Sequence, residues 1–270
     1  MTNKVIAVDL DGTLLNSESK ISDFTKETIK KISAKGHKVI ITTGRPYRMA
    51  LDFYKELELN TPMINFNGSL THIPEQKWEF EQSLTVDKSF LLDMVQRKEE
   101  IEADFIAGEY RKKFYITNTN EEIADPKLFG IDNFKPENQF QAQLVTKNPN
   151  AILLQTHATD KYALAEEMNA FYQHGLSINT WGGPLNILEC GPKGVNKAFA
   201  LQYLLNILNV YRKDLIAFGD EHNDTEMLEF AGTGYAMKNA SETLLPYADQ
   251  QLELTNDQDG VAHKLTELYL

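Results

Sequence analysis

The sequence predicts an α/β protein, a doubly wound parallel sheet whose chain is interrupted by an inserted α+β domain. In the first and last thirds of the chain, buried-strand patterns alternate with helical patterns, which is typical of parallel strands joined by right-handed crossovers. The middle of the chain lacks this regular alternation. The length of 270 residues corresponds to between one and two domains. From this length and the change of pattern, we predict a split core of residues 1–83 and 190–270, with residues 84–189 as an inserted domain.

Three apolar segments in the first third predict strands, and the stretches between them predict helices. Lys4–Leu10 is apolar and rich in β-branched residues, which favours a buried strand. Ser22 is a candidate N-cap for a helix that ends near Gly36, and Pro46 stands where the first turn of a second helix would begin. The other two predicted strands are Lys38–Thr42 and Pro62–Phe66.

The last third repeats the alternation. Helical periodicity predicts the helices Lys197–Leu208, Thr225–Phe230, Ala240–Leu245 and Gly260–Leu270, and apolar runs predict the strands Asp214–Phe218 and Gly234–Met237.

The middle segment is long enough to hold a core of its own. Its predicted helices lie near Val86–Arg97 and Lys161–Tyr172. Its predicted strands are Asp104–Ala107, Phe114–Thr117, Gln141–Val145, Ala151–Gln155, Leu176–Trp181 and Asn186–Glu189.

Charge and composition restrict the partners. The chain has 27 Lys and Arg against 39 Asp and Glu, a formal charge of −12, which argues against a protein whose main partner is nucleic acid. The single cysteine, Cys190, excludes an intrachain disulfide and suits a reducing compartment. No apolar run approaches the ~20 residues of a membrane span, and the run Val5–Val8 is too short for a signal peptide. We therefore expect a cytoplasmic protein with no membrane partner and leave its oligomeric state open.

The first chemical motif is Asp9-Leu10-Asp11-Gly12-Thr13, at the end of the first predicted strand. Ligands of open α/β sheets bind at the carboxyl ends of strands. Two carboxylates there repel each other unless a cation neutralises them, and oxygen ligands suit Mg²⁺. The alternative is a solvated turn. A calcium loop is excluded because Lys20 stands where that loop requires Glu.

Three further motifs occupy equivalent places. Thr42–Pro46 (TTGRP) joins a strand to a helix N-terminus, where free N–H groups favour an anion; the alternative is a turn whose Thr only caps the helix. Gly219–Asp224 (GDEHND) follows another buried strand and offers Asp220, Asn223 and Asp224, with His222 more typical of a solvent-facing side chain. Lys193 and Lys197 precede or open a helix, and the spacing leaves open which one faces a phosphate.

Together these motifs supply paired acids, a hydroxyl, a lysine and a second acid cluster at the ends of core strands. This set favours metal-assisted phosphoryl transfer, in which a carboxylate is the nucleophile and donors hold the equatorial oxygens.

The order of the motifs resembles the haloacid dehalogenase superfamily of phosphohydrolases. The insertion between the second motif and the lysine resembles its Cof-type branch, subclass IIB. Asn65-Phe66-Asn67-Gly68 and Met237-Lys238-Asn239-Ala240 are also similar to that branch, so the resemblance covers essentially the whole chain.

The resemblance implies a role for each matching residue. Asp9 would be the nucleophile, and Asp11 the general acid and then the general base. Lys197, which opens its helix as the family lysine does, would pair with the phosphate and Asp9, although Ala198 departs from the usual Gly. Thr43, Gly44, Asn67 and Asn223 would bind the phosphoryl group or substrate. Asp9, the Asp11 carbonyl and Asp220 would bind Mg²⁺ directly. Asp224 would support the metal site indirectly, by hydrogen bonds to the residues around it.

The resemblance implies an Mg²⁺-dependent phosphatase of small phosphorylated metabolites, such as sugar phosphates, with the insertion as a cap over the site. Residues 179–186, which contain Trp181, Gly182 and Gly183, are the first candidates for specificity, with His157 and Arg111 behind them; Trp181 is equally compatible with the cap's own core. The alternatives are a phosphosugar mutase of the same superfamily, which would return the phosphoryl group to a sugar, and a non-catalytic ligand-binding module.

Overall fold

The computed structural model describes residues 3–173 and 175–270, and its chain divides into two compact units. The core unit comprises the chain up to Arg45, Ala50–Gln82 and Asn196–Leu270. The inserted unit comprises Pro46–Met49 and Ser83–Val195. Each unit is described by itself below.

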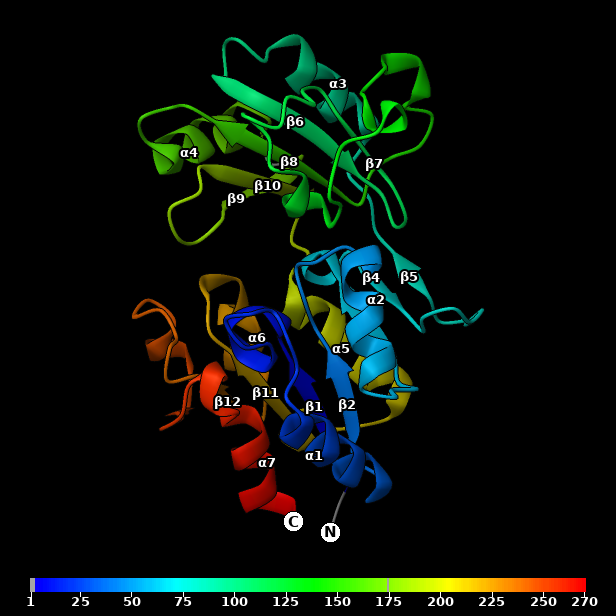
Figure 1. Ribbon diagram of the computed structural model, residues 1–270, viewed down its shortest axis with the longest axis vertical. Coiled ribbons are helices and arrows are strands. Elements are labelled where there is room, and N and C mark those ends of the chain that lie inside the picture. Colours follow the sequence, from blue (N-terminus) through cyan, green and yellow to red (C-terminus); the bar gives the residue numbers. More distant parts are fainter. Residues whose placement is uncertain (1–2, 174) are drawn as a thin grey trace. The chain divides into compact units, whose positions relative to one another are not determined.

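A parallel sheet forms the centre of the core unit (Figure 1). Its order is β13-β12-β11-β1-β2, in which β1 (Val5–Val8) lies between β11 (Leu215–Gly219) and β2 (Lys38–Ile41). Val8, at the end of β1, is in register with Phe218 and Ile41. The carboxyl ends of these strands therefore meet at one edge of the sheet. The sheet continues beyond β11 with β12 (Thr233–Ala236) and β13 (Gln250–Gln251).

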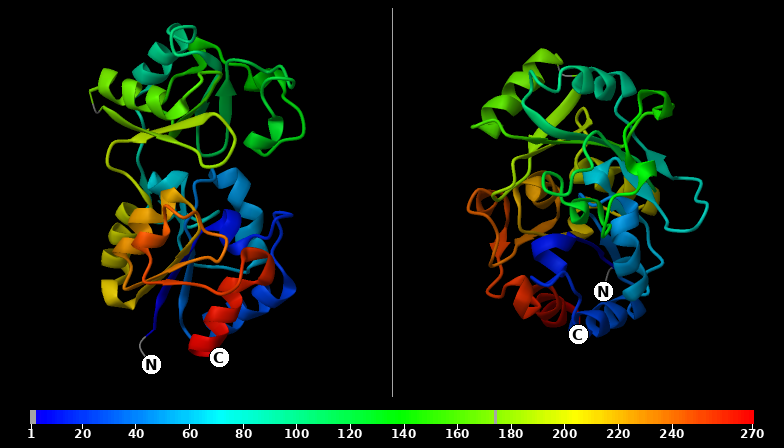
Figure 2. Two further views of the ribbon diagram at one scale, coloured as in Figure 1. Left: turned by 90° about the vertical axis from the view of Figure 1, so that its left-hand side faces the viewer. Right: turned by 45° about the horizontal axis from the view of Figure 1, so that its top comes forward.

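Helices cover both faces of this sheet. Val5 and Ala7 pack against Leu201 and Leu204 of α5 (Lys197–Leu208), in a cluster that also includes α6 (Thr225–Phe230). On the other face, α1 (Asp23–Ala34) packs beside α7 (Gly260–Tyr269), as the left view of Figure 2 shows. Burial on both sides explains why the strands are continuously apolar. The predicted N-cap of α1 is present, because Ser22 Oγ accepts a hydrogen bond from Thr25 N at 3.0 Å.

A short antiparallel sheet follows β2. It has the order β3-β4-β5, with β3 at Met63–Asn65, β4 at Leu70–His72 and β5 at Gln82–Ser83. Between β2 and β3 lies α2 (Tyr47–Glu56). The third strand ends one residue before its predicted limit, because Phe66 adopts a left-handed backbone with φ of 51° and begins the turn η2 (Phe66–Gly68).

The inserted unit contains an antiparallel sheet with the order β7-β6-β8-β10-β9. Side chains alternate across β6 (Ala103–Glu109): Ile106 packs with α3 (Lys88–Gln96) and α4 (Lys161–Phe171), whereas Phe105 packs in a second cluster with Phe129. The predicted α/β class with an inserted α+β segment is therefore confirmed. The other strands are β7 (Phe114–Ile116), β8 (Ala151–Thr156), β9 (Leu176–Thr180) and β10 (Ile187–Pro192).

Two predicted elements are wrong. Residues 141–145 form no strand but a 3-10 turn, η5 (Ala142–Leu144); all of them except Val145 are exposed, because no neighbouring strand covers their apolar side chains. Residues 240–244 form no helix, and the 3-10 turn η8 (Leu245–Tyr247) follows them; Pro246, within that turn, has no N–H with which to continue a helical hydrogen-bond ladder.

None of the helices formed by residues 3–173 and 175–270 is both long and apolar enough to cross a membrane.

Candidate active site

The first and third motifs meet at the carboxyl edge of the core sheet. Asp9 is buried directly after β1, and the chain then makes the wide turn η1 (Leu10–Leu14). Gly12 has φ of +68°, and a Cβ atom there would collide with the carboxylate of Asp220, so this turn requires glycine. Thr13 Oγ1 donates a hydrogen bond to Asp220 Oδ1 at 2.8 Å, which holds the end of β11 against this turn.

Lys197 connects two of the buried acids. Its Nζ lies 2.9 Å from Asp9 Oδ1 and 2.6 Å from Asp224 Oδ1, and its side chain is completely buried. Burial alone would lower the pKa of this ammonium, but the carboxylates of Asp224 and Asp9 outweigh it and raise that pKa. The lysine is therefore held charged. Lys193, the other candidate, is exposed.

The acid cluster carries more negative charge than the lysine offsets. Carboxylate oxygens of Asp9, Asp220 and Asp224 all lie within 4.8 Å of one another. Burial raises the pKa of Asp9 well above its usual value, and burial together with the charge of Asp224 raises the pKa of Asp220 to about 7. Three carboxylates against one ammonium leave two negative charges uncompensated when all are ionised. A divalent cation with hard oxygen ligands fits this arrangement.

Backbone groups orient Asp224 within that cluster. Its Oδ2 accepts hydrogen bonds from the backbone N of Asp220 at 3.0 Å and of Glu221 at 3.2 Å. Its other oxygen is bonded to Lys197, so both oxygens of Asp224 are held in place beside Asp9 and Asp220.

The second motif lies beside β3 and brings several polar groups together. Thr43 is buried at the end of β2, and its carbonyl accepts from the backbone N of Asn67 at 3.1 Å. Gly44 lies so close that a Cβ atom there would be 3.1 Å from the Asn67 side-chain amide. Asn223 Nδ2 donates to Asn67 Oδ1 at 3.1 Å. The four predicted phosphate-binding residues, Thr43, Gly44, Asn67 and Asn223, are thus gathered.

The turn that carries Asn67 has an unusual backbone. Phe66, Asn67 and Gly68 are consecutive residues with φ of 51°, 50° and 108°. A Cβ atom on Gly68 would collide with the carbonyl oxygen of Asn196, next to Lys197. Left-handed conformations in non-glycine residues cost free energy and persist where the surrounding structure enforces them, often at functional sites. This turn directs Asn67 toward Gly44 and Asn223.

Asp11 differs from the other predicted acids because 56% of its side chain is exposed. Its two oxygens accept hydrogen bonds from the guanidinium of Arg45, at 2.7 Å from Nε and 2.5 Å from Nη2. The structure therefore places Asp11 at the rim of the site, held by the arginine of the second motif.

Sequence reasoning assigned no role to three residues that shape the site. Thr13 and Arg45 are bonded to Asp220 and Asp11 as described, and Asn239 Nδ2 donates to the carbonyl of Gly12 at 2.7 Å. Each of the three lies within one of the sequence motifs described above, next to a residue with an assigned role. That position is the only sequence feature that could have pointed to it. Glu221 and His222 lie half-exposed, with the His222 ring nitrogen 3.2 Å from the Glu221 carboxylate.

In the inserted unit, the candidates for specificity make contacts of their own. Trp181 is partly buried against the Phe105 cluster, and its Nε1 donates to Glu189 Oε2 at 3.0 Å, which supports its place in that unit's core. His157 is exposed and lies 2.9 Å from Asp104, and the Arg111 guanidinium lies 5.5 Å from the centre of the Tyr47 ring.

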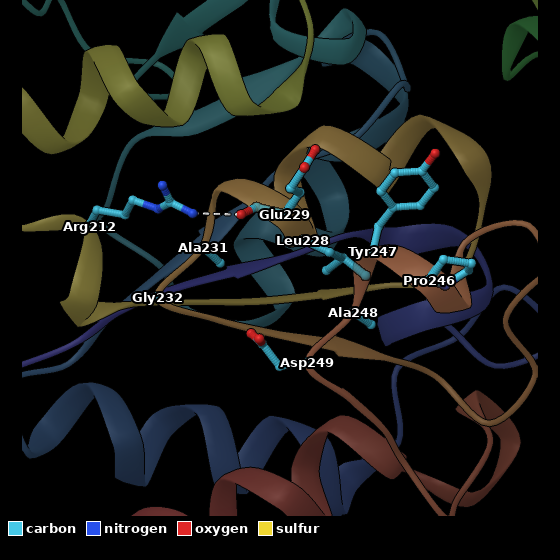
Figure 3. A pocket seen from close by; sticks show the side chains of 9 residues that line it. All are labelled: Arg212, Leu228, Glu229, Ala231, Gly232, Pro246, Tyr247, Ala248 and Asp249. Carbon is cyan, nitrogen blue, oxygen red and sulfur yellow. Dashed lines mark hydrogen bonds between the residues drawn. The ribbon is translucent and has the colours of Figure 1, made fainter.

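A separate cavity of about 340 Å³ opens near the amino ends of β11 and β12 (Figure 3). Its walls include Arg212, whose Nη2 donates to the carbonyl of Glu229 at 2.7 Å, and Asp249. None of the predicted site residues lines it. Since Asp220 and Asp224 follow the carboxyl end of β11, opposite to this cavity, the cavity is not the site described above.

Comparison with known proteins identifies the family. Residues 6–265 match the model of the haloacid dehalogenase-like hydrolases. A 5-amino-6-(5-phospho-D-ribitylamino)uracil phosphatase of Bacillus subtilis is 33% identical over 98% of this chain and 97% of its own length. The solved structure of a haloacid dehalogenase-like hydrolase from Bacteroides thetaiotaomicron superposes with a TM-score of 0.86 at 27% identity, covering 99% of this chain and 100% of that one.

A subclass IIB sugar phosphatase shares the fold, with a TM-score of 0.81 at 21% identity over 98% of this chain and 99% of that one. The chain belongs to the haloacid dehalogenase-like hydrolases, and it is a phosphatase. The family resemblance predicted from the motifs is thereby confirmed.

Proposed function

We propose that this protein is an Mg²⁺-dependent phosphatase that hydrolyses small phosphorylated metabolites through an aspartyl-phosphate on Asp9. The observation that supports this most strongly is the buried Lys197 ammonium between Asp9 and Asp224. A carboxylate oxygen of Asp220 lies within 4.8 Å of oxygens of both acids, so one metal ion could contact all three. Such a cluster orients one carboxylate as a nucleophile while offsetting its repulsion from a phosphate.

The proposed reaction has two displacements. In the first, an oxygen of Asp9 forms a bond to phosphorus, the ester P–O bond breaks, and Asp11 gives its proton to the leaving oxygen. In the second, Asp11 takes a proton from water as the water oxygen bonds to phosphorus, the Asp9–phosphorus bond breaks and inorganic phosphate leaves. One acid serves both steps because they require opposite proton transfers.

The remaining residues hold the phosphoryl group. The Thr43 hydroxyl, the Gly44 N–H, the Asn223 amide and the Lys197 ammonium would donate to its oxygens. Asp9, the Asp11 carbonyl and Asp220 would ligate Mg²⁺, with Asp224 orienting Asp220 and Lys197. When bound, Mg²⁺ neutralises the charge that accumulates between the carboxylates and the phosphate.

The names of similar proteins support the proposed substrate class. One acts on a phosphorylated ribityl compound and another is a sugar phosphatase, so we propose monoesters of sugars or sugar-like alcohols as substrates. We place the protein in the cytoplasm, where the buried free thiol of Cys190 would stay reduced.

The test is release of inorganic phosphate from a panel of monoesters that includes sugar phosphates, a phosphorylated ribityl compound and p-nitrophenyl phosphate. We expect Mg²⁺-dependent turnover of several members and loss of turnover in EDTA. Isomerisation of a sugar phosphate without phosphate release would instead identify a mutase. No turnover of any ester would favour a binding module.

The acid cluster also predicts that Mg²⁺ stabilises the protein more at pH 8 than at pH 5. The pKa of Asp220 is about 7 in the folded protein against 3.8 ordinarily. Between those values the folded state binds more protons than the unfolded state, so the stability of the metal-free protein falls as pH rises. At pH 8 the carboxylates are ionised, and a bound cation offsets their mutual repulsion. At pH 5 the cation must first displace the proton held by Asp220, so it stabilises the protein less.

Thermal unfolding of EDTA-treated protein, with and without Mg²⁺, measures the effect at each pH. An Asp220→Asn variant should show a smaller Mg²⁺ shift and less dependence of that shift on pH. Equal shifts of the wild-type Tm at the two pH values would contradict the prediction.

A further inference from the structure

We propose that Arg45 is the positioning residue for Asp11, holding its carboxylate in the one orientation from which it can exchange a proton with the leaving group and then with water. The inference rests on the proposed function, because it assigns a partner to the acid and base of that reaction. Arg45 itself transfers no proton and is assigned no contact with the substrate.

The geometry of the pair carries the inference. Nε and Nη2 of Arg45 bond to the two different oxygens of Asp11, at 2.7 and 2.5 Å. A guanidinium that binds both oxygens fixes the plane of a carboxylate as well as its position. Without it, the Asp11 side chain, more than half exposed, would be free to rotate into solvent.

Arg45 is itself held firmly. Its backbone carbonyl accepts hydrogen bonds from Asn65 Nδ2 at 3.0 Å and from the backbone N of Phe66 at 3.3 Å, and its own N–H donates to Thr43 Oγ1 at 3.1 Å. Its guanidinium carbon lies 5.3 Å from the centre of the Phe53 ring. Only 19% of the arginine side chain is exposed, against 56% for Asp11.

A buried pair supports this anchor from behind. Asn65 and His72 are fully buried, and His72 Nε2 lies 2.9 Å from Asn65 Oδ1. That contact leaves the Asn65 amide nitrogen directed at the Arg45 carbonyl. Hydrogen bonds from His72 through Asn65 and Arg45 to Asp11 therefore connect the paired strands β3 and β4 to a side chain at the rim of the site.

The pairing still leaves Asp11 able to react. Each carboxylate oxygen has two lone pairs, and the two hydrogen bonds from Arg45 use one on each oxygen. The other positions remain for the proton that passes to the leaving oxygen and, later, for the proton taken from water. Since a misplacement of about 1 Å can cost 10²-fold in rate, fixing this orientation matters most for a step that needs the proton.

The test compares two esters in an Arg45→Met variant, which keeps an unbranched apolar stem but is shorter and lacks the guanidinium donors. Expulsion of an alkoxide from a sugar phosphate needs a proton from Asp11, whereas p-nitrophenolate leaves without one. Because kcat/KM reports the steps up to ester cleavage, we expect it to fall about tenfold or more for the sugar phosphate. For p-nitrophenyl phosphate it should fall less than about threefold.

Arg97→Met is the matched control. Arg97 bonds to both oxygens of Glu100, at 2.7 and 2.6 Å, and is 21% exposed, yet it belongs to the inserted unit. It should leave the ratio of the two kcat/KM values unchanged. Arg45→Lys, which keeps the positive charge on a single donor nitrogen, should recover part of the loss. Circular dichroism should show that each variant is folded.

The outcomes separate the two proposals. Equal losses for both esters would overturn the positioning role and indicate that Arg45 binds the phosphoryl group itself, and no loss for either would also overturn it; in both cases the proposed function stands. If the wild-type protein hydrolyses neither ester in Mg²⁺, the proposed function fails and the role of Arg45 fails with it.

Discussion

Replacing Asp9 by Asn is expected to reduce phosphate release by about 10⁴-fold or more, because an amide nitrogen or oxygen cannot replace a carboxylate as nucleophile. The fold should survive the change. Asn has nearly the same shape, and burial already raises the pKa of Asp9, so the ionised form is unfavourable where it lies. The variant removes one negative charge from a cluster in which three carboxylates face one ammonium.

Phosphate release and thermal unfolding of the same preparation measure the two effects. We expect turnover near the detection limit and a Tm in EDTA equal to or above that of the wild type. Asp52→Asn is the control, since Asp52 is an exposed acid of the same unit and should change neither. Retention of more than a few per cent of activity in Asp9→Asn would exclude Asp9 as the nucleophile.

Local sequence patterns predicted the frame of this site well. The strand at Lys4–Leu10 and the helix at Lys197–Leu208 depend on apolar periodicity, which reflects burial directly, and the structure contains β1 and α5 there. Parallel strands bring their carboxyl ends to one edge, so motifs far apart in sequence could be expected to meet. The meeting of Asp9 with Asp220 and Asp224 follows from that topology.

Contacts between side chains that are distant in the sequence were harder to predict. Spacing left Lys193 and Lys197 equivalent, and the family resemblance, not a local pattern, favoured Lys197. Only the fold shows that Lys197 lies buried between two acids while Lys193 is exposed. The pairing of Asp11 with Arg45 likewise depends on how two loops approach each other, and no periodicity encodes that.

The strained backbone of the turn at Phe66–Gly68 could not be predicted from the sequence either. Nothing in the residue types of Asn65–Gly68 announces that Phe66, a large aromatic residue, adopts a positive φ, because such a conformation is imposed by neighbours. The missed turn at residues 141–145 has the opposite cause. Its residues suit a strand locally, but the fold gives them no partner on which to bury a face.

Replacing Lys197 by Met is expected to reduce turnover by about 10³-fold or more and to lower the stability of the metal-free protein. The stem of Met fills most of the buried space, but the ammonium that offsets Asp9 and Asp224 is lost. Removing one partner of a buried ion pair typically costs about 3–5 kcal/mol. The catalytic loss is separate, since the phosphoryl oxygens also lose a positively charged donor.

Lys193→Met is the matched control for this variant, because it makes the same chemical change four positions earlier at an exposed side chain. It should change kcat/KM by less than about twofold and leave Tm unchanged, as expected for an exposed residue. In Lys197→Met, Mg²⁺ should restore part of the lost Tm, because a cation partly replaces the missing charge, yet turnover should stay low. A larger loss of turnover in Lys193→Met than in Lys197→Met would show that the exposed lysine serves the phosphate and would remove Lys197 from the proposed mechanism.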